Sequence, residues 1–141
     1  MMKSAILILF LLAMAATAHP QEAKGIVTKI LDGSTFEVNT LGCVRLADIV
    51  SVPASSMGGL KAREFTRDTI ANTQVFLDID NQTGQDKDGC WMCVVYRALP
   101  NGTPNLNANF NQMYVNAGYG RISDNPDTEF NPANWSSSEG K

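Results

Sequence analysis

Residues 25–49 alternate apolar and polar side chains and are interrupted twice by short turn sequences. The turns fall at 32–34 and 39–42, where Asp, Gly, Ser, Asn and Thr gather. Alternation with a period of two is the pattern of half-buried strands. The stretch therefore predicts three short strands, which restricts the chain to a β-rich class of fold.

The pattern then changes to that of a helix. Residues 51–59 are rich in Ser, Gly and Pro and predict a loop, and a helix is expected from 60 to about 72. Leu60, Phe65 and Ile70 recur at helical spacing and predict its buried face. A further strand is expected at 74–80.

The second half predicts one further strand, a second helix and a short extended piece. A polar loop is expected at 81–89, a strand at 91–99, a helix at 107–117 and a short extended piece at 119–122. Glycine at 118 suits the left-handed end of that helix. Five strands, with one helix after the third and another after the fifth, predict a mainly β (α+β) fold with two or three helices. Its architecture is a five-stranded barrel of the oligonucleotide/oligosaccharide-binding (OB) type.

The first 18 residues have the composition of a secretory signal peptide. Lys3 supplies the positive start, residues 5–16 are apolar, and Ala16-Thr17-Ala18 is a small-x-small cleavage site. The apolar run is short for a membrane span, so the mature chain is expected to be extracytoplasmic, secreted or associated with an envelope, with residues 19–24 as a short leading segment. The alternative is that the leader stays attached and anchors an interaction protein to an envelope.

If the chain is exported, its three Asn-x-Ser/Thr sequences become potential glycosylation sites. They begin at Asn81, Asn101 and Asn134, and each is a potential N-glycosylation site in an exported protein.

The chain has three cysteines, an odd number for an oxidising compartment. In the expected barrel the third and fifth strands are neighbours, so Cys43 can pair with Cys90 or Cys93. Cys90 and Cys93 cannot bond to each other across an extended strand, because three residues span about 10 Å and a disulfide tolerates at most about 7 Å. The alternative is three buried free thiols.

The charge balance is acidic. Eleven Lys and Arg stand against 14 Asp and Glu, giving a formal charge of −3. Nucleic-acid binders usually carry a basic stripe, and none is visible here. The composition therefore disfavours a polynucleotide partner and names no other. Four aspartates at 78, 80, 86 and 88 predict a solvated acidic hairpin, with structural calcium binding as the alternative.

Four segments, at 27–35, 44–49, 86–89 and 109–119, resemble the staphylococcal nuclease-like (thermonuclease) family in their order and spacing. The resemblance covers residues 25–122 and leaves 123–141 as an Asn-, Pro- and Ser-rich tail. It implies the same OB-type barrel. In this family the reaction is calcium-dependent cleavage of phosphodiesters by carboxylates that hold the metal, a glutamate that activates water, and two arginines that bind the phosphate.

Position by position, the resemblance implies that most of this machinery is replaced. The metal carboxylates fall on Ser34 and Val50, the water-activating glutamate on Pro53 or Ala54, and the second arginine on Cys90. Arg45 alone keeps its family identity. The replacements favour a binding or structural module without a cofactor over an enzyme.

Three other residues complete the candidate site. Asp32 and Asp48 are the carboxylates nearest to the replaced positions, and the alternative function is a degenerate Ca²⁺-dependent phosphodiesterase that uses them with Arg45. Tyr119 is a candidate for stacking on a ligand in a cleft formed with Arg45 and the 51–59 loop. Tyr114, at helical spacing from Phe110, is expected in the core instead.

Overall fold

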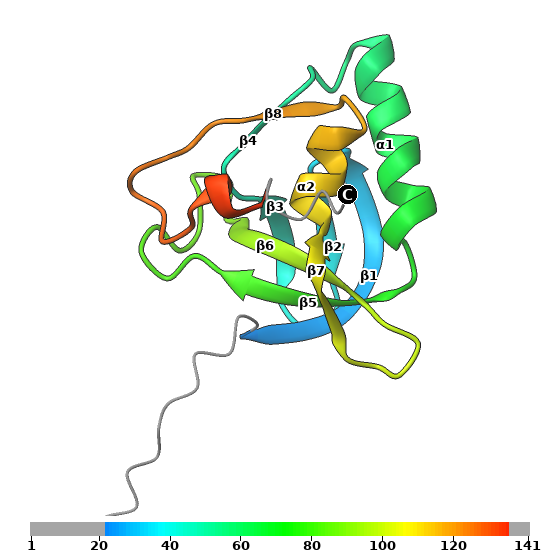
Figure 1. Ribbon diagram of the computed structural model, residues 1–141. Coiled ribbons are helices and arrows are strands. Elements are labelled where there is room, and N and C mark those ends of the chain that lie inside the picture. Colours follow the sequence, from blue (N-terminus) through cyan, green and yellow to red (C-terminus); the bar gives the residue numbers. More distant parts are fainter. Residues whose placement is uncertain (1–21, 136–141) are drawn as a thin grey trace, which may run out of the picture.

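The structure is a computed structural model that describes residues 22–135. The expected leader at 1–18 and the end of the tail at 136–141 lie outside the described residues. Five strands build the barrel in Figure 1: β1 (Ala23–Asp32), β2 (Thr35–Val38), β3 (Gly42–Leu46), β5 (Gln74–Ile79) and β6 (Trp91–Ala98).

A parallel pairing between β3 and β6 closes the barrel. The strands follow the order β3-β2-β1-β5-β6, and Val44 pairs with Trp91 while Leu46 pairs with Cys93. The other pairings in the ring are antiparallel. The expectation of a mainly β fold with a five-stranded OB-type barrel is confirmed.

The alternating apolar residues of the strands fill the barrel. Burying each such side chain contributes about 1.5–3 kcal/mol. The fully buried positions on β1, β2, β3, β5 and β6 include Val27, Phe36, Val38, Val44, Leu46, Val75, Leu77, Cys93 and Val95.

Helix α1 (Met57–Ile70) begins three residues before the predicted start, because the Ser56 hydroxyl accepts a hydrogen bond from the Gly59 N–H at 2.9 Å and caps the first turn. The prediction that Leu60 is buried is wrong, since it is 50% exposed. Small residues face the barrel instead, among them Ala62 and Thr66. The Thr66 hydroxyl donates to the Gly33 carbonyl at 2.5 Å, which requires a close approach of helix and turn.

The second predicted helix is shorter than expected. Residues 104–109 form strand β7 (Pro104–Asn109), which pairs with β6, and α2 (Phe110–Asn116) follows. The Asn109 side chain caps α2 by accepting from the Gln112 N–H at 2.7 Å. Phe110 and Tyr114 are fully buried, as predicted, and Gly118 ends the helix with φ +86°.

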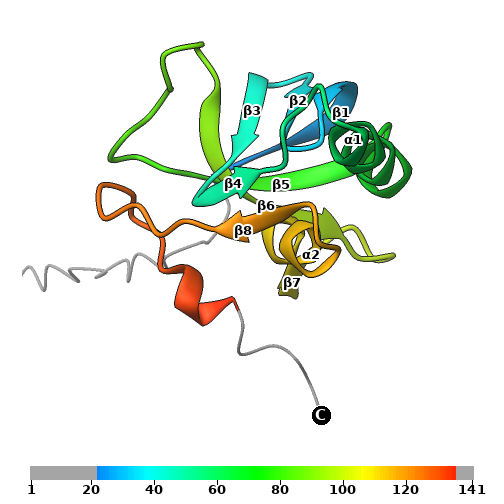
Figure 2. The same cartoon turned by 90° about the horizontal axis from the view of Figure 1, so that it is seen from above.

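Strands β4 (Ile49–Ser51) and β8 (Gly120–Ile122) form a separate two-stranded sheet. After β8 the chain continues as a C-terminal segment, defined here as residues 123–135, which ends in the short 3-10 helix η1 (Pro132–Asn134). This segment and the loop before β6 lie on the side of the barrel opposite α1 (Figures 1 and 2). That arrangement brings distant parts of the sequence around one cavity.

Candidate functional site

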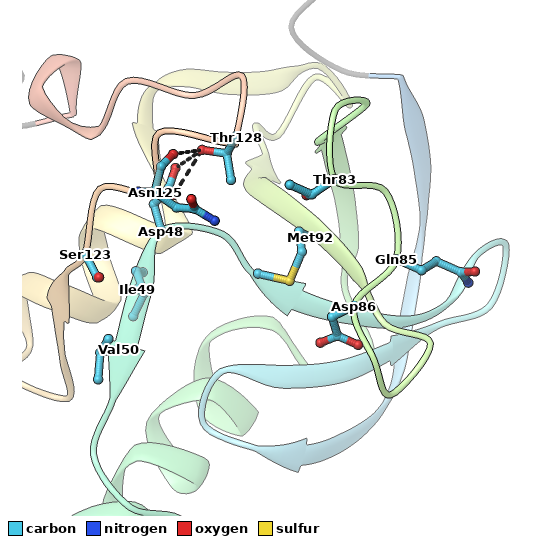
Figure 3. Close-up of a pocket in the computed structure, with 10 residues that line it drawn as sticks. All are labelled: Asp48, Ile49, Val50, Thr83, Gln85, Asp86, Met92, Ser123, Asn125 and Thr128. Atoms are coloured by element: carbon cyan, nitrogen blue, oxygen red, sulfur yellow. Dashed lines mark hydrogen bonds between the residues drawn. The ribbon is translucent and has the colours of Figure 1, made fainter.

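A cavity of about 310 Å³ lies between β4, the C-terminal segment and the acidic loop, a name used here for residues 80–90. Met92 lies between Ile49 on one side and Thr83 on the other (Figure 3). Ten side chains line the cavity: Asp48, Ile49, Val50, Thr83, Gln85, Asp86, Met92, Ser123, Asn125 and Thr128. No lysine or arginine of the described residues is among them.

Arg45, the retained family residue, is engaged by carboxylates of the acidic loop. It projects from β3 and donates to Asp86 and, at 3.3 Å, to Asp88, and its Nε donates to the Thr35 hydroxyl at 3.2 Å. Burial raises the pKa of Asp86, but the N–H groups of Cys90 and Asp88 and the charge of Arg45 bring it below its ordinary value. The guanidinium is therefore already paired with anions of its own chain.

A disulfide between Cys43 and Cys90 joins β3 to the end of the acidic loop. Of the two pairings left open by the sequence, the structure contains the one with Cys90. Cys93 is a free thiol, fully buried in the core, and burial raises its pKa. The disulfide holds the acidic loop beside Arg45.

Asp48 is buried at the turn between β3 and β4, with φ +56°. Its carboxylate accepts from the Asn125 N–H at 3.1 Å, and the Thr128 hydroxyl lies 3.0 and 2.9 Å from its two oxygens. Burial raises the pKa of Asp48, these hydrogen bonds lower it, and the charges of Asp124 and Asp80 raise it further. Asp48 therefore holds the C-terminal segment against the barrel and forms one wall of the cavity.

Asp32 lies on a second, smaller cavity of about 110 Å³ at the β1–β2 turn. Its Oδ1 accepts from the Ser34 N–H at 2.9 Å and from the Ser34 hydroxyl at 3.3 Å. The Ser51 and Tyr114 hydroxyls are 2.6 Å apart in the same wall. Asp32 and Asp48, the candidate metal pair, thus line different cavities.

Tyr119 packs in a cluster of aromatic rings. Its ring centroid lies 5.3 Å from that of Phe65 and 5.9 Å from that of Tyr114. It is half-buried, and its backbone carbonyl accepts from the Val52 N–H at 2.9 Å. The cluster connects α1 to the end of α2.

The glycosylation candidates differ in their surroundings. Asn101 lies in an exposed turn, where its side-chain oxygen accepts from the Thr103 hydroxyl at 2.6 Å. The exposed Asn81 donates to Glu22, and the hydroxyl of Thr83, the third residue of its sequon, donates to Asp80. Asn134 lies in η1 at the end of the described residues.

The four aspartates at 78, 80, 86 and 88 are not uniformly exposed to solvent, so the prediction of a solvated acidic hairpin is wrong. Asp80 is fully buried and accepts from the Gln82 and Glu129 N–H groups at 3.2 and 3.1 Å. Asp78 is half-buried and meets Glu22 and Glu129, with carboxylate oxygens within 4.8 Å of one another. Burial, followed by the charges of Glu129 and Glu22, raises the pKa of Asp78 to about 7.

Several residues of the large cavity are not found by sequence reasoning. Thr128 and Asn125 belong to a tail with no regular pattern, and Met92 stands in an ordinary strand. The contact between Asp48 and Thr128 spans 80 residues. A contact over this sequence separation cannot be predicted from local periodicity.

No family model matches the chain, and no curated protein matches it either. Among residues 22–135, the helices are too short or too polar to cross a membrane. The five-stranded mixed barrel, the disulfide and the cavities lined by Asp48 and by Asp32 are therefore the observations on which a function has to be built.

Proposed function

We propose that the chain is an exported staphylococcal nuclease-like barrel that binds a ligand in its large cavity and does not cleave nucleic acid. The observation that carries the proposal is the state of Arg45. Its guanidinium is paired with Asp86 and Asp88. An arginine that stabilises a phosphate in a transition state has to offer its donors to the substrate.

The cavity supports the same reading. Val50, at the place of a metal carboxylate in the family resemblance, lines it with an apolar side chain. The two carboxylates in its wall both accept hydrogen bonds from their own chain, Asp86 from Arg45 and Asp48 from Thr128. The two carboxylates repel a polyphosphate, but the cavity between them remains available to a ligand of another kind.

Export is supported by two independent features. Residues 1–18 have the pattern of a signal peptide, and the Cys43–Cys90 disulfide is the kind of bond that persists in oxidising compartments. Both favour an extracytoplasmic site of action.

The test is a cleavage assay on the purified mature domain. It uses single-stranded DNA, duplex DNA and RNA, first with Ca²⁺ and then with a chelator, beside an Arg45→Ala control. We expect no cleavage at high protein concentration. Calcium-dependent cleavage that disappears in Arg45→Ala would refute the proposal.

A degenerate phosphodiesterase is the second candidate, and the small cavity favours it. Asp32 with the hydroxyls of Ser34, Ser51 and Tyr114 supplies oxygen atoms, which are the ligands that Ca²⁺ takes in proteins. A single carboxylate is a poor donor set for this ion, so the binding function is preferred. If calcium-dependent cleavage is found, Asp32→Asn should abolish it.

A further inference from the structure

The two carboxylates of the large cavity differ in charge balance. Asp86 is matched by Arg45. Asp48 accepts hydrogen bonds from neutral groups alone among those described, the Asn125 N–H and the Thr128 hydroxyl. Asp80 and Asp124 are close enough to add their negative charge to its surroundings. The Asp48 side of the cavity therefore carries an uncompensated negative charge.

Asp48 also has acceptor capacity left over. A carboxylate has about four lone-pair positions, and a hydroxyl has one proton, so Thr128 and Asn125 supply two donors. About two positions remain, and because Asp48 lines the cavity, a donor bound there can use them.

The rest of the lining adds an apolar surface to this charge. Ile49, Val50 and Met92 line the cavity, and Val50 is 43% exposed although it lies on a strand. A methionine side chain adapts its shape to different apolar partners. Neutral polar groups complete the wall, from Thr83, Gln85, Ser123 and Asn125.

We propose that this cavity binds a small primary alkylammonium ion, with the ammonium group at Asp48 and the alkyl chain against Val50 and Met92. The inference rests on the proposed function, a cavity that binds a ligand without cleaving nucleic acid. An ammonium ion supplies both the missing charge and the missing donors. The alkyl chain covers the exposed apolar wall, and the described lining residues offer no cation to an anionic ligand.

The proposal has a pH signature, because ammonium binds the ionised carboxylate. Burial raises the pKa of Asp48, so binding releases a proton wherever Asp48 is still partly protonated. Affinity should rise with pH through that range and then level off. The other acidic groups that act on Asp48 or share the cavity are Asp80, Asp86 and Asp124, and negative charge on any of them also favours a bound cation.

The experiment is a calorimetric titration of the mature domain with n-butylammonium, n-butanol and butyrate. We expect butylammonium to bind about tenfold more tightly than butanol, the difference that one charge-assisted hydrogen bond provides, and butyrate not to bind. Equal affinity for butylammonium and butanol would overturn the proposal.

The decisive variant is Asp48→Asn, which removes the charge, keeps a hydrogen-bonding side chain of the same shape, and suits the left-handed backbone at φ +56°. It should abolish the preference for butylammonium and the pH dependence of binding. Asp88→Asn makes the same change of net charge outside the lining and should leave binding unchanged. An equal loss in both variants would overturn the proposal, since it would indicate general electrostatic attraction.

Val50→Lys gives an independent test that leaves Asp48 in place. The exposed position accepts the longer side chain, whose own ammonium group can reach into the cavity and exclude butylammonium; unchanged affinity in this variant would contradict the proposal. A parallel titration with N-acetyl-lysine amide, which mimics a lysine side chain of a protein, identifies the source of the ammonium group. Tighter binding of this compound than of butylammonium indicates a protein lysine, and the reverse order indicates a free amine.

The two proposals fail separately. Cleavage of nucleic acid refutes the proposed function whatever the titrations show. An inactive protein that binds butanol as tightly as butylammonium refutes the alkylammonium site and leaves the loss of nuclease activity standing.

Discussion

The large cavity is enclosed by two segments that are held in different ways. The acidic loop is attached covalently by Cys43–Cys90 and by the ion pairs of Arg45. The C-terminal segment is held by hydrogen bonds to two buried carboxylates, Asp48 and Asp80. One wall is thus fixed to the barrel by a covalent bond that persists when the protein unfolds, and the other depends on the polar contacts of the folded state.

The largest expected effect comes from removing the covalent attachment. In the chain-entropy account, a bond across 47 residues contributes about 4 kcal/mol to the free energy of unfolding. Urea unfolding of the double variant Cys43→Ser/Cys90→Ser should show a loss of this order. A loss below about 1 kcal/mol would mean that the β3–β6 pairing holds the acidic loop without the disulfide.

The next effect concerns the other wall. Asp48→Ala removes the acceptor for Asn125 and Thr128 and places alanine at a positive φ. Losing the hydrogen bonds to a charged acceptor and straining the backbone should cost about 2–4 kcal/mol. Limited proteolysis should then cut within residues 123–135 much faster than in wild type. Asp48→Asn is the matched control and should protect the segment nearly as well as the natural residue.

A pH effect distinguishes the two walls further, since Glu129 of the C-terminal segment meets Asp78. The pKa of Asp78 rises from 3.8 to about 7 in the folded protein, so the folded state holds a proton that the unfolded chain has lost. Stability should therefore fall as pH rises from about 4 to 7. Asp78→Asn should flatten this slope and exceed wild type at pH 8.

The control for this effect is Asp68→Asn, on the exposed face of α1. It makes the same change of net charge away from the cluster and should keep the wild-type slope. Thermal unfolding across this pH range compares the three proteins, and parallel curves for wild type and Asp78→Asn would contradict the prediction.

The smallest effect is expected at Arg45. The side chains of Arg45 and Asp88 are 31% and 55% exposed, and ion pairs this open to solvent contribute about 0–1 kcal/mol. A double-mutant cycle of Arg45→Met with Asp88→Asn should give a coupling energy in this range. A coupling energy above about 2 kcal/mol would show that the ion pair, together with the disulfide, holds the acidic loop against the barrel.

The barrel could be predicted from the sequence because its strands follow a local rule. Phe36 and Val38 stand on either side of Glu37, Val44 and Leu46 stand on either side of Arg45, and all four apolar residues face the core. In these strands the period therefore reveals both the strand and its buried face. The pairing of Cys43 required more, since two partners were compatible with adjacent strands. The register of β3 against β6, with Leu46 opposite Cys93, decides between them.

The failures have physical reasons as well. Leu60 is apolar but exposed because it lies outside the buried face of α1, which is made by Gly59, Ala62, Thr66 and Ile70. Where this face meets the β1–β2 turn there is little space, since a Cβ on Gly33 would lie 2.7 Å from the Ala62 Cβ. Strand β7 is rich in asparagine, which is uncommon in strands, and it forms because β6 offers a free edge. The cavity itself depends on the hydrogen bond between Thr128 and Asp48. A contact between two polar residues so far apart in the sequence leaves no periodic pattern from which it could be predicted.

The buried position of Cys93 has a consequence for the order of events in biogenesis. If the chain is exported, as proposed above, it meets an oxidant while its three thiols are still reactive, and two of the three possible bonds are wrong. Once β3 and β6 align, Cys93 is enclosed at zero exposure and Cys43 and Cys90 are the pair left to react. Formation of the barrel therefore selects the Cys43–Cys90 bond by burying the third thiol. The correct disulfide is expected to form after the strands have assembled, and not before.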